Sequence, residues 1–477
     1  MKYRQRYFVL LTVVFSVCLT YGASGQTLNF SNHREVEIPD YATVRIGPFY
    51  STLTFYQYFG YRYVASSGAG VDFLFSNRRG EVRKDGSDLP LITTLNFRNY
   101  LFITRHCDLD LSFAASYEYY PLETQESAFF LDPAEEGLFG NISMELQLTP
   151  VLKATILNNL VYRTDYVDTR GYEDPYGGRD YRYFSNKSGV DMDWLMARDK
   201  NLAFSVSLSR NIPEEDEFMD QDLTSIDETL KYEQKLNPFI VAGLDTGFGQ
   251  NTYNSGERPD SVYQTYSLFG NIRLTKSTSG SASAGYAMGT ASGTDESQGE
   301  KDLGMAVGKV AVKSALTRTV SHSFEYDRGF VVGYNAAFEL NNTYQYRLDL
   351  KGRWNAKMGI YSRYMDVEPT SETINQYSDW ATGMDISYPL TPFVALQMVS
   401  EYLIRANGSI ESGAEPVDVE WQSDYNTWRN RIGTSFAIFE DIGLTAYIQH
   451  VNRTSDSADL EYERLTASVM FNYKHKF

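Results

Sequence analysis

The chain has little cysteine and no long apolar segment beyond its first residues. Of 477 residues only Cys18 and Cys107 are cysteines, and Cys107 alone would remain after removal of an N-terminal signal, which excludes an internal disulfide framework. Past residue 25 no apolar run reaches 18 residues, the length that indicates a transmembrane helix. The stability of the chain must therefore come from elsewhere, and any passage through a membrane would have to use strands.

Basic charge and catalytic motifs are also scarce. The chain carries 43 Lys and Arg against 61 Asp and Glu, a net charge of −18, which argues against nucleic acid as a partner. None of the five His lies in a metal-ligand spacing or beside a nucleophile in a known motif. His106, close to Asp108 and Asp110, fits a solvated turn better than a hydrolase site. We therefore predict no enzyme activity, no catalytic residues, no bound metal and no cofactor.

Two other segments could suggest ligand binding but fit simpler explanations. Gly247-Phe248-Gly249 is a fragment of a glycine loop and opens no helix, so it does not predict a nucleotide site. The acidic run from Glu214 to Asp222 could hold Ca²⁺, but it lacks the ligand order of an EF-hand. A solvated acidic loop is the better explanation.

The N-terminus has the three-part form of a secretory signal peptide. Lys2, Arg4 and Arg6 precede an apolar run over residues 7–19, and small residues follow before Gln26. The alternatives are a membrane anchor, for which the run is short, and a lipoprotein acylated at Cys18, which Val17 disfavours. We expect residues 1–25 to be a signal peptide cleaved near Gly25, followed by a short periplasmic segment, 26–43.

Alternation of apolar and polar residues is the main signal in the rest of the chain. In residues 343–354, TYQYRLDLKGRW, the apolar row is Tyr344, Tyr346, Leu348, Leu350 and Trp354. Residues 108–120 and 201–210 alternate in the same way. Period two over eight or more residues predicts strands with one apolar and one polar face.

The lengths of these strands and their connections favour a transmembrane barrel. Many strands span roughly 10–14 residues, close to the 9–11 tilted residues that cross a bilayer. Short connections, several containing Leu-Thr as in Leu148-Thr149-Pro150, alternate with long polar ones such as residues 166–188. We predict an all-β fold over residues 44–477: an antiparallel up-and-down transmembrane β-barrel of about 20 strands, with 16–22 as the range, short periplasmic turns and long extracellular loops.

The polar rows carry charges of both signs, which would be costly against lipid. We therefore expect these side chains to face water or one another in the lumen. The candidate lumen-facing residues are Asp108, Asp110, Glu118, Glu145, Lys153, Arg163, Arg347, Asp349, Lys351, Arg353, Asp385, Arg429 and Arg431.

The C-terminal segment VMFNYKHKF predicts a closing strand. Val469, Phe471, Tyr473 and Phe477 share one face, and in a closed barrel the last strand pairs with the first. The segment resembles the C-terminal signal of bacterial outer-membrane proteins, carried here by Phe471, Tyr473 and Phe477. His475 and the lack of a glycine in the last ten positions depart from that pattern.

Most of the expected mature chain resembles the β-barrel porin family of the second type. The resemblance rests on TLTFYQYFGYRY (52–63), LITTLNFRNYLF (91–102), DLDLSFAASYEYY (108–120), LTRTVSHSFEYDRGF (316–330) and ERLTASVMFNYKHKF (463–477). It implies an outer-membrane barrel of porin type, and some members occur with exopolysaccharide systems. No functional residue can be transferred from it.

The predicted function is a water-filled channel in the outer membrane of a Gram-negative envelope, used for passive diffusion of small hydrophilic solutes. The alternatives are an export barrel associated with exopolysaccharide and a structural or interaction barrel without an open pore. The expected partners are outer-membrane lipid, the barrel-assembly machinery and the solutes themselves, with a homo-oligomer as an open possibility. Residues 26–43 are too few for a plug domain, which argues against a siderophore-type transporter.

Overall fold

The computed structural model describes residues 44–68, 86–104, 106–119, 121, 128–130, 140–165, 181–214, 222–254, 260–292, 301–331, 338–369, 376–407, 424–439, 441–458 and 461–476. The expected signal peptide (1–25), the segment 26–43 and Phe477 lie outside these residues. Within the described ranges, no helix has the length and hydropathy needed to cross a membrane.

The described residues are almost entirely β-strand, with one short 3₁₀ turn at Arg353–Asn355. The strands are β1 (Val44–Ile46), β2 (Phe49–Ser67), β3 (Gly86–Asp88), β4 (Leu91–Thr104), β5 (Cys107–Tyr119), β6 (Ala128–Phe130), β7 (Gly140–Thr149), β8 (Leu152–Asp165), β9 (Tyr181–Ala197), β10 (Lys200–Pro213), β11 (Leu223–Asn237), β12 (Ile240–Tyr253), β13 (Asp260–Arg273), β14 (Thr278–Ser292), β15 (Lys301–Ala315), β16 (Val320–Val331), β17 (Glu339–Lys351), β18 (Lys357–Pro369), β19 (Tyr377–Thr391), β20 (Val394–Asn407), β21 (Tyr425–Phe439), β22 (Ile442–Ser455) and β23 (Tyr462–Lys476).

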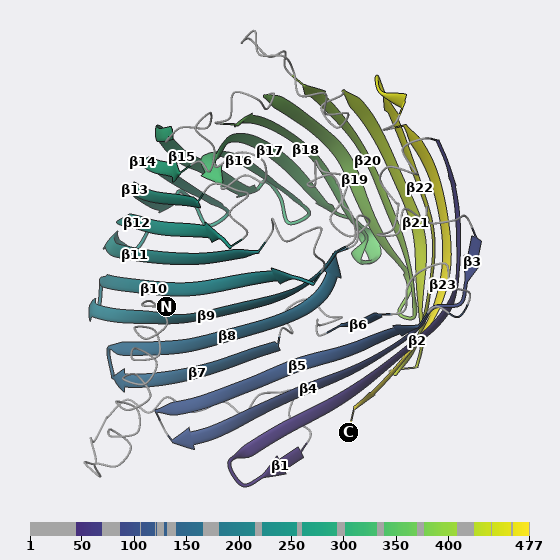
Figure 1. Cartoon of the computed structure of the whole chain (residues 1–477), viewed down its shortest axis with the longest axis horizontal. Coiled ribbons are helices and arrows are strands. Elements are labelled where there is room, and N and C mark those ends of the chain that lie inside the picture. Colours follow the sequence, from purple (N-terminus) through teal and green to yellow (C-terminus); the bar gives the residue numbers. More distant parts are fainter. Residues whose placement is uncertain are drawn as a thin grey trace. The chain divides into compact units, whose positions relative to one another are not determined.

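Twenty of these strands form a closed antiparallel barrel, which confirms the predicted fold class. Neighbours in sequence pair with one another from β4 to β23, and β5 pairs with β7 past the three-residue β6. The ring closes where β2 pairs with β4 on one edge and with β23 on the other. Figure 1 shows β2, at the purple end of the colour scale, beside the yellow β23. The three-residue strands β1, β3 and β6 extend this ring locally.

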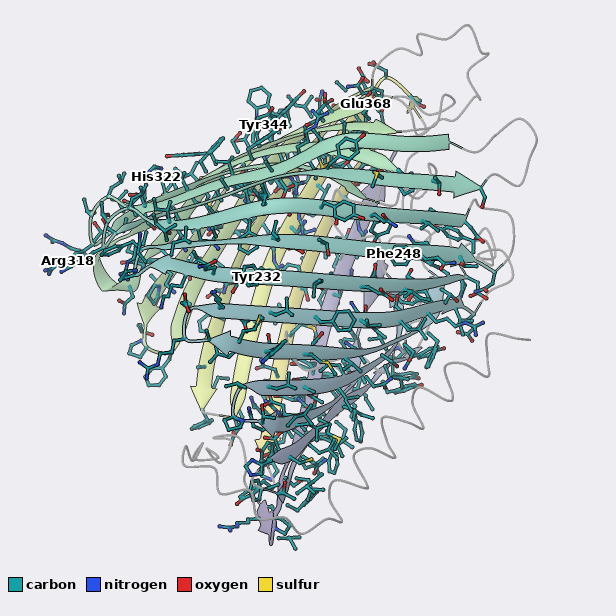
Figure 2. The ribbon with its side chains drawn as sticks, turned by 90° about the vertical axis from the view of Figure 1, so that its left-hand side faces the viewer. Tyr232, Phe248, Arg318, His322, Tyr344 and Glu368 are labelled. Atoms are coloured by element: carbon teal, nitrogen blue, oxygen red, sulfur yellow. The ribbon has the colours of Figure 1, made fainter. Side chains whose placement is uncertain are left out.

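Tight turns join the strands at one end of the barrel, which we call the short-turn end, and Arg318 in Figure 2 lies there. The recurring Leu-Thr motif explains several of them. The hydroxyl oxygens of Thr149, Thr275, Thr317 and Thr391 each accept a hydrogen bond from the backbone N–H two residues later, at 3.1–3.3 Å. Threonine thus lies at the end of the strand or just beyond it and stabilises the return by a local side-chain bond. The connections at the opposite end are longer, with 17 residues between β20 and β21 numbered 408–424.

Cross-strand register separates the two faces of the barrel. On the outer face Tyr344 of β17 pairs with Tyr326 of β16 and Tyr364 of β18, with ring centroids 4.7 and 6.2 Å away. Tyr344 is 43% exposed, and in Figure 2 it points away from the barrel. Residues at alternate positions therefore face inward.

The outer face carries a belt of exposed large apolar side chains that continues around the ring. Members on strands spread over the ring include Phe59, Leu95, Phe113, Ile142, Trp194, Phe204, Leu230, Leu244, Leu268, Tyr286, Val310, Phe324, Tyr346, Ile360, Trp380, Trp428, Ile448 and Val469. The buried polar residues of the strands lie almost entirely on the inner face, as for Thr94, Ser116 and Thr427. The barrel is thus apolar outside and polar inside.

Candidate functional site

The inner face of the barrel is the candidate functional site, because the charged side chains of the strands gather there. By register, ten of the predicted residues lie on the face opposite the exposed apolar belt: Asp108, Asp110, Glu145, Lys153, Arg347, Asp349, Lys351, Asp385, Arg429 and Arg431. Glu118 and Arg163 belong to β5 and β8, but their side chains lie outside the described part. That this face lines water remains a proposal.

Arg353 departs from the predicted row. The strand β17 ends at Lys351, and Arg353 begins the 3₁₀ turn that leads to β18. The turn is tight: Gly352 N–H donates to the carbonyl of Ala356 at 2.7 Å, and Asn355 has a φ of 63°. Asparagine tolerates this left-handed conformation better than most residues, so the alternation stops two residues earlier than the sequence pattern suggests.

Three of the predicted charges meet in one cluster that crosses a strand. The Arg347 guanidinium donates to Asp349 on its own strand at 2.8 Å and to Asp385 of β19 at 2.9 Å. To reach β19 it passes over β18 at Gly359, where an added Cβ would lie 2.6 Å from the Asp385 carboxylate. Glycine at 359 is therefore required for the side chain to cross.

The same arrangement recurs one strand further on. Tyr361 of β18 donates to Glu401 of β20 and passes over β19 at Gly383, where a Cβ would lie 2.6 Å from the phenolic oxygen. On the other side of the barrel, Tyr263 of β13 reaches Asp227 of β11 at 2.8 Å. An inward glycine on the middle strand thus lets a long side chain tie together strands that are not neighbours.

Further ion pairs neutralise cations elsewhere on the inner face. Lys153 pairs with Glu145 at 2.9 Å, and Arg98 pairs with Asp110 at 3.3 Å. Lys309 pairs with both Glu325 and Asp327 of β16. These pairs are partly exposed, so each contributes little stability alone, but each leaves its cation with a counter-charge.

A buried charge cluster lies toward the long-connection end. Arg405 of β20 donates to both oxygens of Asp379 of β19, at 2.6 and 2.5 Å, and their side chains are 3% and 2% exposed. The guanidinium also lies 4.4 Å from the ring centroid of Tyr377 and 5.3 Å from that of Tyr425. A bidentate geometry with aromatic faces is the arrangement that suits a desolvated arginine.

An apolar contact lies on the inner face near the same end. Phe338, just before β17, is 1% exposed and lies against Gly289 of β14, where a Cβ would be 2.7 Å from its ring. Leu340 packs with Ala287 and Met305 of β14 and β15. The β15–β16 ladder ends at Gly308 and Arg328, so the start of β17 packs against the inner face of β14 and β15 beyond that point.

Sequence reasoning missed the residues of the buried cluster, although their signal was present. Asp379 lies an even number of residues from the predicted Asp385 on β19, so both share one face, and Arg405 shares a face with Glu401 on β20 in the same way. Applying the alternation to every strand would have placed them on the inner row. Their pairing needed the register of β19 against β20, which the sequence pattern does not supply. Within the described ranges, no group of three or more His, Cys, Asp or Glu is placed to hold a metal ion.

Comparisons with known proteins return similar folds at low identity. The alcaligin outer membrane receptor FauA from Bordetella pertussis is 10% identical, with a TM-score of 0.47, covering 89% of this chain and 76% of its own. The siderophore receptor PirA from Pseudomonas aeruginosa is 9% identical, with a TM-score of 0.48 and coverages of 89% and 80%. OpdL from the same organism is 10% identical, with a TM-score of 0.41 and coverages of 90% and 99%.

No protein-family model matches the chain, and no curated protein matches it significantly. The likeness to the β-barrel porin family of the second type therefore remains a resemblance carried by the motifs quoted above.

Proposed function

We propose that the chain is an integral outer-membrane β-barrel that forms a channel for small hydrophilic solutes. The observation that carries this proposal is the opposite character of the two faces. Large apolar side chains are exposed on the outer face around the ring, whereas ion pairs such as Arg347–Asp385 occupy the inner face. A water-soluble barrel would not expose a belt of this extent, and a lipid-facing belt explains it.

The two ends of the barrel support an orientation in the outer membrane. Short turns occupy one end and long polar connections the other. In bacterial barrels the short turns face the periplasm and the long loops face outward. We accordingly assign the short-turn end to the periplasmic side. The partners in this proposal are outer-membrane lipid and the barrel-assembly machinery.

The test is a conductance measurement. Protein folded in detergent and added to a planar lipid bilayer should give discrete current steps in KCl. Vesicles that contain it should swell in isotonic solutions of small sugars and stop swelling as the sugar size increases. Heat-unfolded protein, which no longer has the compact gel mobility of the folded barrel, is the control and should give neither signal.

One observation favours a second candidate, a barrel without an open pore. Phe338 and Leu340 pack on the inner face of β14 and β15, and the Arg405–Asp379 cluster is buried toward the same end. Folded protein that inserts into bilayers but gives no current steps would support this closed form and contradict the channel.

A further inference from the structure

The inner face of four consecutive strands, β21, β22, β23 and β2, carries cations but no carboxylate among its described side chains. The alternate positions that face inward on these strands contain Arg62, Arg429, Arg431, Arg453, Arg464 and Lys474. The acidic residue of β23, Glu463, lies on the outer face, where it bonds to His450 at 2.8 Å. The charges that these four strands present inward are thus all positive.

Three of these cations, Arg429, Arg431 and Arg453, occupy neighbouring inward positions on β21 and β22. Arg429 lies opposite Val451, which lies opposite Arg464. Arg453 lies one inward-facing position closer to the long-connection end than Arg429, and Arg431 lies one inward-facing position closer to the short-turn end. Arg62 of β2 lies opposite Ser468 on one side and opposite Asp88 of β3 on the other, and Arg464 is buried, so neither is counted in this group. Inward positions along a strand are about 6.8 Å apart, so Arg453, Arg429 and Arg431 span roughly 14 Å along the strands.

Arg429 and Arg431 differ from the paired inner cations because no ion pair joins them to a carboxylate in the described part of the chain. The nearest acid in register is Glu401 of β20, directly opposite Arg429. Its carboxylate, however, accepts the hydrogen bond from Tyr361 on the other side, across Gly383. Tyr361 thereby holds Glu401 toward β18 and leaves the Arg429 guanidinium available.

Aromatic rings hold two of these guanidinium groups. Arg431 lies 4.2 Å from the ring centroid of Tyr447, and Arg431 is exposed. Arg453 lies 4.3 Å from the centroid of Tyr425 and 5.2 Å from that of Tyr462. The Arg453 Nε also donates to the Thr427 hydroxyl at 3.1 Å. Stacking occupies the faces of a guanidinium, so its remaining N–H groups stay open to a planar oxyanion.

We propose that the three arginines Arg429, Arg431 and Arg453, which we call the basic wall, bind the carboxylate groups of anionic solutes. The inference rests on the proposed channel, since it assigns the class of solute that the channel favours. A surface of one charge sign in a partly enclosed space raises the local concentration of counter-ions, here anions. Tyr361 is a positioning residue: it acts on the wall through Glu401.

The experiment compares two sugars that differ by one carboxylate, galacturonate and galactose. Binding is measured by isothermal titration calorimetry on the folded barrel in detergent, which needs no open pore, and by blockade of the single-channel current. Galacturonate should bind the unmodified barrel and reduce the current, and galactose should do neither. An R429Q/R431Q variant should bind galacturonate about tenfold more weakly or worse, because each substitution removes hydrogen bonds from a charged donor, which contribute more to binding than neutral ones.

Three further variants separate the basic wall from general charge loss. R347Q also removes an inner-face cation, but one that is already paired with Asp349 and Asp385, so it should leave galacturonate binding within about twofold of the unmodified protein. Y361F should weaken galacturonate binding, because it releases Glu401 to pair with Arg429. The combined Y361F/E401Q variant should restore it, which a purely structural role of Tyr361 would not produce.

Three results would overturn the inference: equal binding of both sugars, equal loss in R347Q and R429Q/R431Q, or conductance without any galacturonate binding. Galacturonate binding without conductance would support the wall and contradict the open channel. Compact gel mobility that is lost on heating checks that each variant is folded.

Discussion

Removing the Asp379 carboxylate should destabilise the barrel strongly, because it would leave the buried Arg405 guanidinium without the acceptor of its two charge-assisted hydrogen bonds. The two side chains are 2% and 3% exposed and joined by two hydrogen bonds. The rings of Tyr377 and Tyr425 occupy other sides of the guanidinium. Water therefore has little access to the guanidinium and cannot easily replace the lost carboxylate as a hydrogen-bond acceptor.

The expected loss follows from the burial of the pair. Breaking a buried ion pair by removing one partner costs about 3–5 kcal/mol, so D379A should lower the free energy of unfolding by that amount. The matched control is D385A, which removes one partner of Arg347 from a pair whose side chains are 34% and 39% exposed. An exposed pair contributes roughly 0–1 kcal/mol, and Asp349 still holds Arg347 in that variant.

The assay is urea unfolding of the barrel folded into lipid vesicles, followed by tryptophan fluorescence. The double variant D379L/R405M should recover part of the loss, since a buried pair replaced by apolar side chains is close to neutral. A D379A loss no larger than that of D385A would refute the argument that burial makes this pair important. A double variant as unstable as the sum of the two single variants would show that the charges do not act on one another.

Two further predictions concern the facing of strands and assembly. In a C107S background, a single cysteine at position 347 should react with a small water-soluble thiol reagent, whereas one at position 346 should react only with a membrane-dissolved probe; exchanged reactivity would mean a one-residue slip of register. Changing Tyr473 and Phe477 together to Ser should lower the amount of folded barrel in the outer membrane, measured by heat-modifiable gel migration; unchanged levels would contradict a role for these aromatics in assembly.

Much of the fold could be predicted from local patterns because a strand with one apolar and one polar face repeats every two residues. The alternation at Tyr344 and Tyr346 placed both residues correctly on one face, and the Leu-Thr motif located tight turns whose hydroxyl bonds appear in the structure. Both signals span only a few consecutive residues, so they can be recognised in the sequence without knowing which strands pair.

The geometry of the inner face could not be predicted in the same way. The contact of Arg347 with Asp385 depends on two neighbouring pairings and on a glycine at the right position of the strand between them. Arg353 was assigned to the row because the alternation says nothing about where a strand stops. Asn355 adopts a φ of 63° because of the conformation of the whole turn, which the alternation does not describe.

The pairing of β2 with β23 has a consequence for the order of events in biogenesis. These strands come from opposite ends of the described chain, and Thr54 pairs with Lys476. Contacts between such distant segments form late, because the entropy of closing so large a loop must be overcome first. We expect the other strand pairings to form while the seam is still open. Until it closes, β2 and β23 each keep a free edge that can pair with another chain, so a chain cut short before β23 should be lost to aggregation or proteolysis.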